Sequence, residues 1–199
     1  MIQADAYNFK YIPNNYLEPK EVTPKAQIKV FRHDSSNGDY FRDLDAALNW
    51  NFELPDATLF SILDQLENFR RPDGKFRFKL CYPERWGWAG GRCNEWLQTS
   101  NPVTDTEITG FERISNNLIA FRSRLVNGAT VAWEGIGRSN DSSSGSLIDD
   151  DPTGSNWFTA IGAYRTGKET LPNTIPGPYQ DPYADSFSMV HVVELYVLT

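Results

Sequence analysis

The sequence predicts a mainly β protein: an antiparallel β-sandwich of the jelly-roll type, preceded by an extended N-terminal arm and one amphipathic helix. Two observations support this prediction. Beyond Gly74, short alternating or mostly apolar stretches follow one another, and turn-forming residues separate them. Before Gly74, the longest regular pattern is one apolar stripe at helical spacing. We therefore expect an anchoring region over residues 1–73 and a β-sandwich domain over residues 74–199.

The first 25 residues are expected to form an extended arm. Pro13, Pro19 and Pro24 each restrict the preceding residue to extended geometry. The apolar residues of this segment lack helical spacing, and they are Tyr7, Phe9, Tyr11, Tyr16 and Leu17. Such an arm needs another surface to cover, which is either its own domain or a neighbouring subunit.

Three elements are expected between the arm and Gly74. Residues 26–32 alternate and predict a strand, and residues 43–50 predict a short helix. Residues 56–70 predict the main helix, with Asp56 as its N-cap and a Pro-Asp-Gly turn after it. The apolar stripe of this helix consists of Leu59, Phe60, Ile62, Leu63, Leu66 and Phe69.

The second region is expected to consist of short strands. Residues 75–82 alternate strictly, which is typical of a strand with one buried face. Residues 157–164 are mostly apolar and predict a central strand, and residues 189–198 predict a long closing strand. The remaining expected strands cover residues 96–98, 107–114, 118–125 and 130–133.

Composition and charge exclude several classes of protein. The six Trp, nine Tyr and twelve Phe residues supply enough apolar area for a folded core, and no apolar run is long enough to span a membrane. The net charge of −7 argues against nucleic-acid binding. Residues 139–199 carry eight acidic and two basic residues, which predicts an acidic face. The first residues lack a basic and an apolar segment, so no secretory signal is expected.

Several segments beyond Gly74 occur in a characteristic order. They are 78–84 (FKLCYPE), 93–102 (CNEWLQTSNP), 108–111 (ITGF), 133–137 (WEGIG), 157–164 (WFTAIGAY), 175–178 (IPGP) and 193–197 (VELYV). This series resembles a poorly characterised extracellular module of surface proteins from marine and aquatic eukaryotes, with similar segments in viral proteins. Three of the segments also resemble the discoidin-like jelly roll, although their spacing differs. The resemblance implies an extracellular β-sandwich and implies no particular reaction.

The chain has two cysteines, Cys81 and Cys93, which flank an eleven-residue loop. They form either a disulfide that closes the loop or two buried free thiols. In the modules that the chain resembles, the same two positions carry Cys, which implies a disulfide and an oxidising environment.

The loop between the cysteines is a candidate ligand-binding feature. It contains Trp86 and Trp88 with glycines around them, and Arg85 and Arg92 flank them. Indole rings in this arrangement suit stacking on a sugar ring or an aromatic group. The alternative is that one indole caps the core and the other contacts a neighbouring subunit.

A serine-rich loop further along carries adjacent carboxylates. Asp141, Asp149, Asp150 and Asp151 offer oxygen ligands of the kind that calcium prefers, although no EF-hand spacing is present. Calcium is the one cofactor that the sequence suggests, and an acidic, solvated loop is the alternative explanation.

Catalytic patterns are weak in this chain. It contains no Gly-x-Ser-x-Gly, Walker or His-Glu-x-x-His motif, and its two histidines are His33 and His191. We expect His191 to be an ordinary strand histidine. A glycoside hydrolase would need a pair of carboxylates, for which the candidates are Glu84, Glu95 and Glu134.

The function that we predict is non-enzymatic. The chain is expected to be a structural or attachment protein of an extracellular particle, a capsid or tail component of a virion, which oligomerises with neighbouring subunits through its arm. The alternative is a lectin-like module that binds cell-surface glycans through its Trp-rich loop, and a glycoside hydrolase is the residual alternative. Neither nucleic-acid binding nor membrane insertion is expected.

Overall fold

The computed structural model is mainly β and antiparallel, as predicted. It describes residues 26–84, 93–115, 124–126, 129–131, 133–139, 145–149, 159–164, 173–179 and 187–199. The expected arm lies outside the described residues.

The described chain contains mostly strands, with one short α-helix and one 3₁₀ helix. In chain order the elements are β1 (Gln27–Asp34), α1 (Leu44–Leu48), β2 (Asn49–Trp50), β3 (Leu59–Ile62), η1 (Leu63–Phe69), β4 (Phe76–Cys81), β5 (Cys93–Gln98), β6 (Glu112–Ser115), β7 (Arg124–Val126), β8 (Ala129–Val131), β9 (Gly137–Arg138), β10 (Ile148–Asp149), β11 (Ile175–Tyr179), β12 (Phe187–Val190) and β13 (Val192–Leu198).

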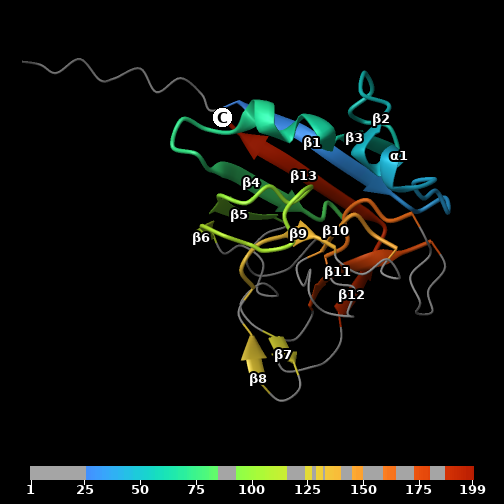
Figure 1. Cartoon of the computed structure of the whole chain (residues 1–199). Coiled ribbons are helices and arrows are strands. Elements are labelled where there is room, and N and C mark those ends of the chain that lie inside the picture. The colour runs from blue at the N-terminus through green and yellow to red at the C-terminus, as the bar shows by residue number, and fades with distance from the viewer. Residues whose placement is uncertain are drawn as a thin grey trace, which may run out of the picture.

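Seven strands form the main antiparallel sheet, in the order β2-β3-β1-β13-β4-β5-β6 (Figure 1). The closing strand β13 lies between β1 and β4 and pairs with both of them. Strand β1 precedes the expected boundary at residue 73, and β4 follows it. The boundary therefore does not separate two bodies, because the chain on both of its sides shares one sheet and one core.

Shorter ladders of strands face the main sheet and complete a β-sandwich-like arrangement. β9 pairs with β10, β11 with β12 and β7 with β8; in Figure 1 the first two ladders lie directly below the main sheet, and the β7–β8 hairpin extends away from them. The core between the layers is rich in aromatic side chains. Its largest fully buried members are Trp96, Tyr82, Phe31, Phe41, Phe76, Phe78, Leu63, Leu66, Leu80 and Ile136.

The strand predicted at residues 75–82 is confirmed, and the short helix predicted at residues 43–50 is confirmed for residues 44–48, whereas residues 49–50 form β2. In β4, Phe76, Phe78 and Leu80 point into the core, and the residues between them are only half-buried. The short helix expected at 43–50 is α1, and Asp43 caps its N-terminus by accepting a hydrogen bond from the backbone N–H of Ala46, at 2.9 Å.

The helix predicted over residues 56–70 is wrong in its first half. Residues 59–62 form β3, because the open edge of β1 offers them backbone partners; Phe31 lies opposite Ser61. Asp56 is no N-cap, and its carboxylate instead contacts the Lys29 amino group at 2.7 Å. Within residues 56–70, only η1 is helical. Its buried Leu63 and Leu66 are three residues apart, which fits the three residues per turn of a 3₁₀ helix.

Three strand predictions also need correction. In the described part of 157–164, Ile161 forms a single bridge to Ile148, and Thr159 and Gly162 have φ of 46° and 72°, outside the strand region. This segment is apolar because it is buried. The closing strand is split at His191 into β12 and β13, and the strand expected from residue 107 starts only at residue 112.

Candidate functional site

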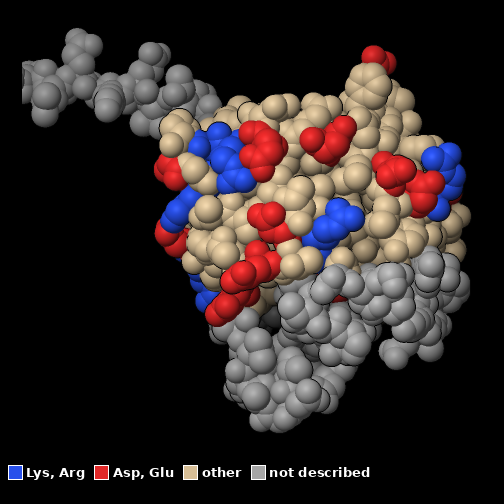
Figure 2. All heavy atoms as spheres, in the orientation of Figure 1, with Lys and Arg blue, Asp and Glu red and all other residues tan. Residues whose placement is uncertain are grey.

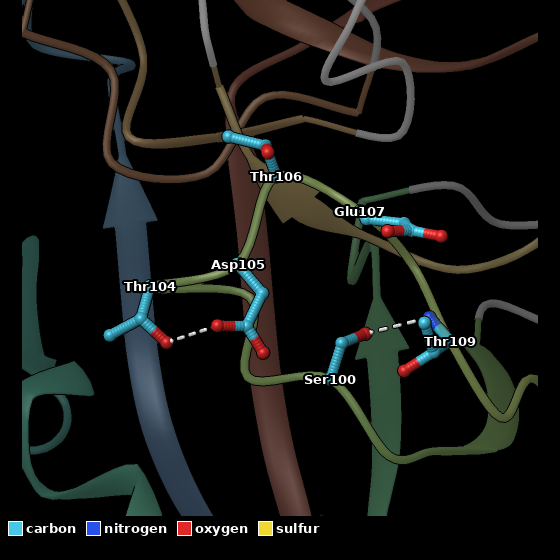
Figure 3. A pocket seen from close by; sticks show the side chains of 6 residues that line it. All are labelled: Ser100, Thr104, Asp105, Thr106, Glu107 and Thr109. Carbon is cyan, nitrogen blue, oxygen red and sulfur yellow. Dashed lines mark hydrogen bonds between the residues drawn. The ribbon is translucent and has the colours of Figure 1, made fainter.

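The loop from β5 to β6 lines a hollow of about 330 Å³ that is open to solvent. Four of its lining residues carry hydroxyl groups and two carry carboxylates: Ser100, Thr104, Asp105, Thr106, Glu107 and Thr109. We call this the hydroxyl hollow. Figure 3 shows the Asp105 carboxylate between the side chains of Thr104 and Ser100.

A tight turn at the start of the loop fixes the lining. The Asp105 carboxylate accepts a hydrogen bond from the backbone N–H of Asn101 at 2.9 Å, and the Asp105 N–H donates to the Asn101 carbonyl at 2.8 Å. The Asn101 side-chain oxygen accepts from the Val103 N–H at 2.9 Å, an Asx-type turn. The Thr104 hydroxyl donates a hydrogen bond to the Asp105 carboxylate at 2.7 Å. Each polar group of this turn therefore has a defined position before any ligand arrives.

Beneath the hollow, the buried amide of Gln98 joins the loop to the opposite layer. Its nitrogen donates to the carbonyl oxygens of Ser100 and Ile136, at 3.0 and 2.7 Å. Its oxygen accepts from the Trp96 indole N–H at 3.1 Å and from the Ile136 N–H at 3.2 Å. Both donors and both acceptor positions of the amide are thus occupied, which fixes its orientation.

Two arginines outside the lining hold the loop against its neighbours. Arg138 donates to the carbonyl oxygen of Val103 at 2.7 Å, and Arg70 donates to that of Thr99, also at 2.7 Å. Arg70 also pairs with Glu67, which accepts from the Asn101 side chain. The hydrogen bond from Arg70 lowers the pKa of Glu67; burial opposes this effect, and the bond from Asn101 adds to it.

Gly110 allows the loop to return close to its own start. Its φ is +66°, and a Cβ added there would lie 2.0 Å from the hydroxyl oxygen of Thr99. The N–H groups of Thr99 and Ser100 both donate to the Thr109 carbonyl, at 2.8 and 3.4 Å. The Thr109 N–H in turn donates to the Ser100 hydroxyl at 3.0 Å (Figure 3).

The lining is suited to binding a neutral, polar ligand. Hydroxyl groups both donate and accept hydrogen bonds, and carboxylates accept them from alcohols. Neither a basic side chain nor a thiol lines the hollow. A ligand with several alcohol groups matches this set of donors and acceptors better than an anion does, because the two carboxylates repel negative charge.

The structure confirms the predicted disulfide between Cys81 and Cys93. The two residues lie directly opposite each other in the β4–β5 ladder, with their Cα atoms 4.1 Å apart. The candidate ligand residues of the loop that this bridge closes, Arg85, Trp86, Trp88 and Arg92, lie outside the described residues.

The proposed calcium ligands are only partly visible. Asp149 lies in β10 and is 1% exposed, so it does not belong to a solvated loop. Asp141, Asp150 and Asp151 lie outside the described residues. Within the described ranges, no group of three or more His, Cys, Asp or Glu residues is arranged to hold a metal ion.

The three candidates for a catalytic carboxylate pair, Glu84, Glu95 and Glu134, make no contact with one another among the described residues. Glu95 pairs with Arg77 at 2.9 Å on the outer face of the sheet, Glu84 accepts a hydrogen bond from the His191 N–H, and Glu134 is exposed. His191 is half-buried at the break between β12 and β13, and its Nδ1 lies 2.7 Å from the Asn173 carbonyl.

His33, the other histidine, is fully buried in β1. Its Nε2 donates to the Asp39 carbonyl at 2.9 Å, and its Nδ1 has no hydrogen-bond partner. Burial lowers the pKa of His33 from 6.5 to about 4, so this ring is neutral at physiological pH.

Sequence reasoning missed the hydroxyl hollow. The available signal was composition, because residues 99–109 contain five Ser or Thr residues and two carboxylates. No family model, no curated protein and no solved structure matches the chain. Among the described helices, none is long and apolar enough to cross a membrane.

Proposed function

We propose that this chain is a non-enzymatic binding protein that recognises polyhydroxylated ligands, glycans in the first place, at the hydroxyl hollow. The observation that carries this proposal is the lining itself, four hydroxyl residues and two carboxylates on one loop. Sugar alcohols donate to carboxylates and exchange hydrogen bonds with hydroxyls.

Preorganisation of the loop supports the same proposal. The turn at Asn101 and Asp105, and the buried amide of Gln98 beneath it, hold the lining through bonds that exist without a ligand. A site that is already ordered loses less conformational entropy on binding. This favours ligands such as sugars, whose polar contacts are individually weak.

The test is glycan-array screening of the full chain, with and without a chelator, followed by calorimetric titration of the sugar that binds best. Thr106→Val with Glu107→Gln removes two lining groups for which the structure shows no side-chain hydrogen bond, so folding is expected to be unchanged. We expect the affinity to fall about tenfold or more.

A matched control makes two changes of the same kind elsewhere. Thr58→Val with Asp45→Asn changes an exposed hydroxyl and an exposed carboxylate away from the hollow, and should bind like the natural chain. Trp86→Ala with Trp88→Ala forms a third arm. If no sugar binds, or if only the tryptophan variant loses affinity, the hollow is not the glycan site.

A second candidate is a structural or attachment protein of an extracellular particle. The disulfide Cys81–Cys93 supports it, because such bonds persist in oxidising compartments and on particle surfaces. In this proposal the arm, residues 1–25, contacts neighbouring subunits. Deletion of the arm should lower the oligomeric state of the assembly, and an unchanged assembly would exclude anchoring by the arm.

A further inference from the structure

The end of β2 and the segment between β2 and β3 carry a group of exposed apolar side chains. Trp50, Phe52 and Leu54 are 37%, 62% and 61% exposed. Among the described residues, only Ile114 is a further large apolar side chain of this kind. The segment projects from the body of the molecule (Figures 1 and 2). We call Trp50, Phe52 and Leu54 the apolar tip.

The tip is held in its exposed position by its own backbone. Asn51 has φ of 51°, and its carbonyl accepts a hydrogen bond from the Leu54 N–H at 2.7 Å. The Asn51 amide donates to the carbonyl of Leu59 at 2.8 Å, and the Ala57 N–H donates to the carbonyl of Leu54 at 3.0 Å. The fold therefore presents these apolar side chains to solvent, where each costs free energy unless another surface covers it.

The segment that carries the tip is acidic, although three of its six carboxylates are ion-paired: Asp43 with Arg42, Asp56 with Lys29 and Glu67 with Arg70. Residues 43–69 contain six acidic residues and no basic residue. Asp56 is neutralised by Lys29, but Glu53, beside Phe52, makes no ion pair with any described residue. A surface that covers the tip should therefore be positively charged and should offer apolar area as well.

The next eleven residues of the chain have the opposite charge. Residues 70–80 contain five basic residues and one acidic residue. Lys75, directly before β4, and Arg77 and Lys79 on β4 alternate with the buried side chains and so share the outer face of the sheet. We call these three residues the basic stripe. Figure 2 shows several Lys and Arg side chains on the side of the molecule away from the projecting segment.

Of the three cations of the stripe, only Lys79 has no carboxylate partner among the described residues, and the stripe borders apolar surface. Glu112 pairs with Lys75 and Glu95 with Arg77, whereas Lys79 donates only to the neutral side chain of Gln27, at 3.0 Å. Two half-buried residues flank the stripe: Leu97 lies opposite Arg77 on β5, and Tyr196 lies opposite Lys79 on β13.

We propose that the apolar tip of one copy docks on the basic stripe of a second copy, so that the chain self-associates head to tail. Phe52 and Leu54 then cover Leu97 and Tyr196, and Glu53 lies near Lys79. Tip-to-tip pairing would bring like charges together and is disfavoured. A head-to-tail contact uses two different surfaces, so a growing chain of copies keeps one free tip and one free stripe at its ends. The product is an open filament, or a ring if these two ends meet. This association is independent of ligand binding at the hydroxyl hollow.

The test is analytical ultracentrifugation of the full chain over a concentration series. The natural chain should form reversible species larger than a dimer. A tip variant, Phe52→Ser with Leu54→Ser, and a stripe variant, Lys75→Glu with Lys79→Glu, should each remain monomeric. Thermal unfolding checks that both are folded, and Ile114→Ser, which removes an exposed apolar side chain from β6, should assemble like the natural chain.

Mixing the two variants gives the decisive result. The tip variant still has its stripe, and the stripe variant still has its tip, so an equimolar mixture should form a one-to-one dimer and nothing larger. A natural chain that is monomeric throughout overturns the proposal. A stripe variant that pairs with itself, or a tip variant that assembles normally, also overturns it, because the contact would then lie at other surfaces.

Discussion

Two buried amides on the same face of β5 should respond to the same substitution with opposite signs. Gln98 makes four hydrogen bonds, to Trp96, Ser100 and both backbone groups of Ile136. Asn94, four residues before it, is 1% exposed, and neither its nitrogen nor its oxygen has a partner. Replacement by Leu removes the amide in each case; Leu has the shape of Asn and is one heavy atom shorter than Gln.

The expected magnitudes follow from the bonds that are lost. Gln98→Leu leaves four buried polar groups without a partner. At about 1 kcal/mol for each, the free energy of unfolding should fall by about 4 kcal/mol, and the melting temperature by about 10 °C. Asn94→Leu removes an amide whose burial is uncompensated, and should raise the free energy of unfolding by about 1 kcal/mol.

Urea unfolding followed by tryptophan fluorescence measures both changes. The slope against urea should stay constant, because neither substitution alters the size of the core. If both variants lost the same free energy of unfolding, the reasoning would be refuted, because burial of the side chain and not its hydrogen bonds would then determine the loss. A Gln98→Leu variant as stable as the natural chain would show that its four bonds contribute nothing.

Three further outcomes are expected. Replacing Cys81 and Cys93 together by Ala should lower the free energy of unfolding by about 3 kcal/mol, measured in urea, because the twelve-residue span is no longer closed in the unfolded chain. His33 is neutral in the folded state with a pKa of about 4 against 6.5 unfolded, so its contribution is complete above pH 6.5. As the pH falls from 6.5 to 4, about 3 kcal/mol is lost, and His33→Gln should remove that part of the pH profile. Gly110→Ala should lower stability by about 1–3 kcal/mol and weaken ligand binding at the hydroxyl hollow, because its Cβ would meet Thr99; calorimetry measures both, and unchanged binding would contradict the role given to this turn.

The strict alternation of residues 75–82 predicted a strand, and the structure agrees. β4 was recognisable because its side chains alternate strictly between core and outer face, and such alternation fits no helix. The spacing of the two cysteines allowed a disulfide or two free thiols, and the resemblance of this segment to extracellular modules implied the disulfide. The structure decides between them, because it places Cys81 directly opposite Cys93 in the ladder.

The predictions that were wrong depended on contacts distant in sequence. Residues 59–66 contain apolar residues at helical spacing, yet the edge of β1 and the pairing of Lys29 with Asp56 favour a strand for the first four of them. In the described part of the segment expected as a strand, residues 159–163 are mostly apolar because they are buried, and a buried loop with left-handed φ values has the same composition as a strand. Neither feature leaves a local signal.

The hydroxyl hollow shows the same division between local and distant causes. Its residue types were visible in the sequence, and so was the turn signal at Asn101. Its shape was not, because the loop is held by Gln98 through Ile136, 38 residues away, and by Arg138. Polar loops are common, and only the long-range bonds distinguish one that is ordered for binding.

The position of the last strand determines how the parts of this chain depend on one another. β13 is hydrogen-bonded to β1 on one side and to β4 on the other, so the segment that carries the apolar tip joins the rest of the sheet through the final residues. Both ends of the described chain must therefore be present before the sheet is complete, and pairing of such distant segments slows folding.

The boundary expected near residue 73 marks a change in sequence pattern, from a mixed segment to short strands. It does not mark a change in packing, because η1 and β4 on either side of it contribute to the same core. The apolar tip and the basic stripe consequently belong to one sheet, which holds both surfaces in fixed positions for a neighbouring copy.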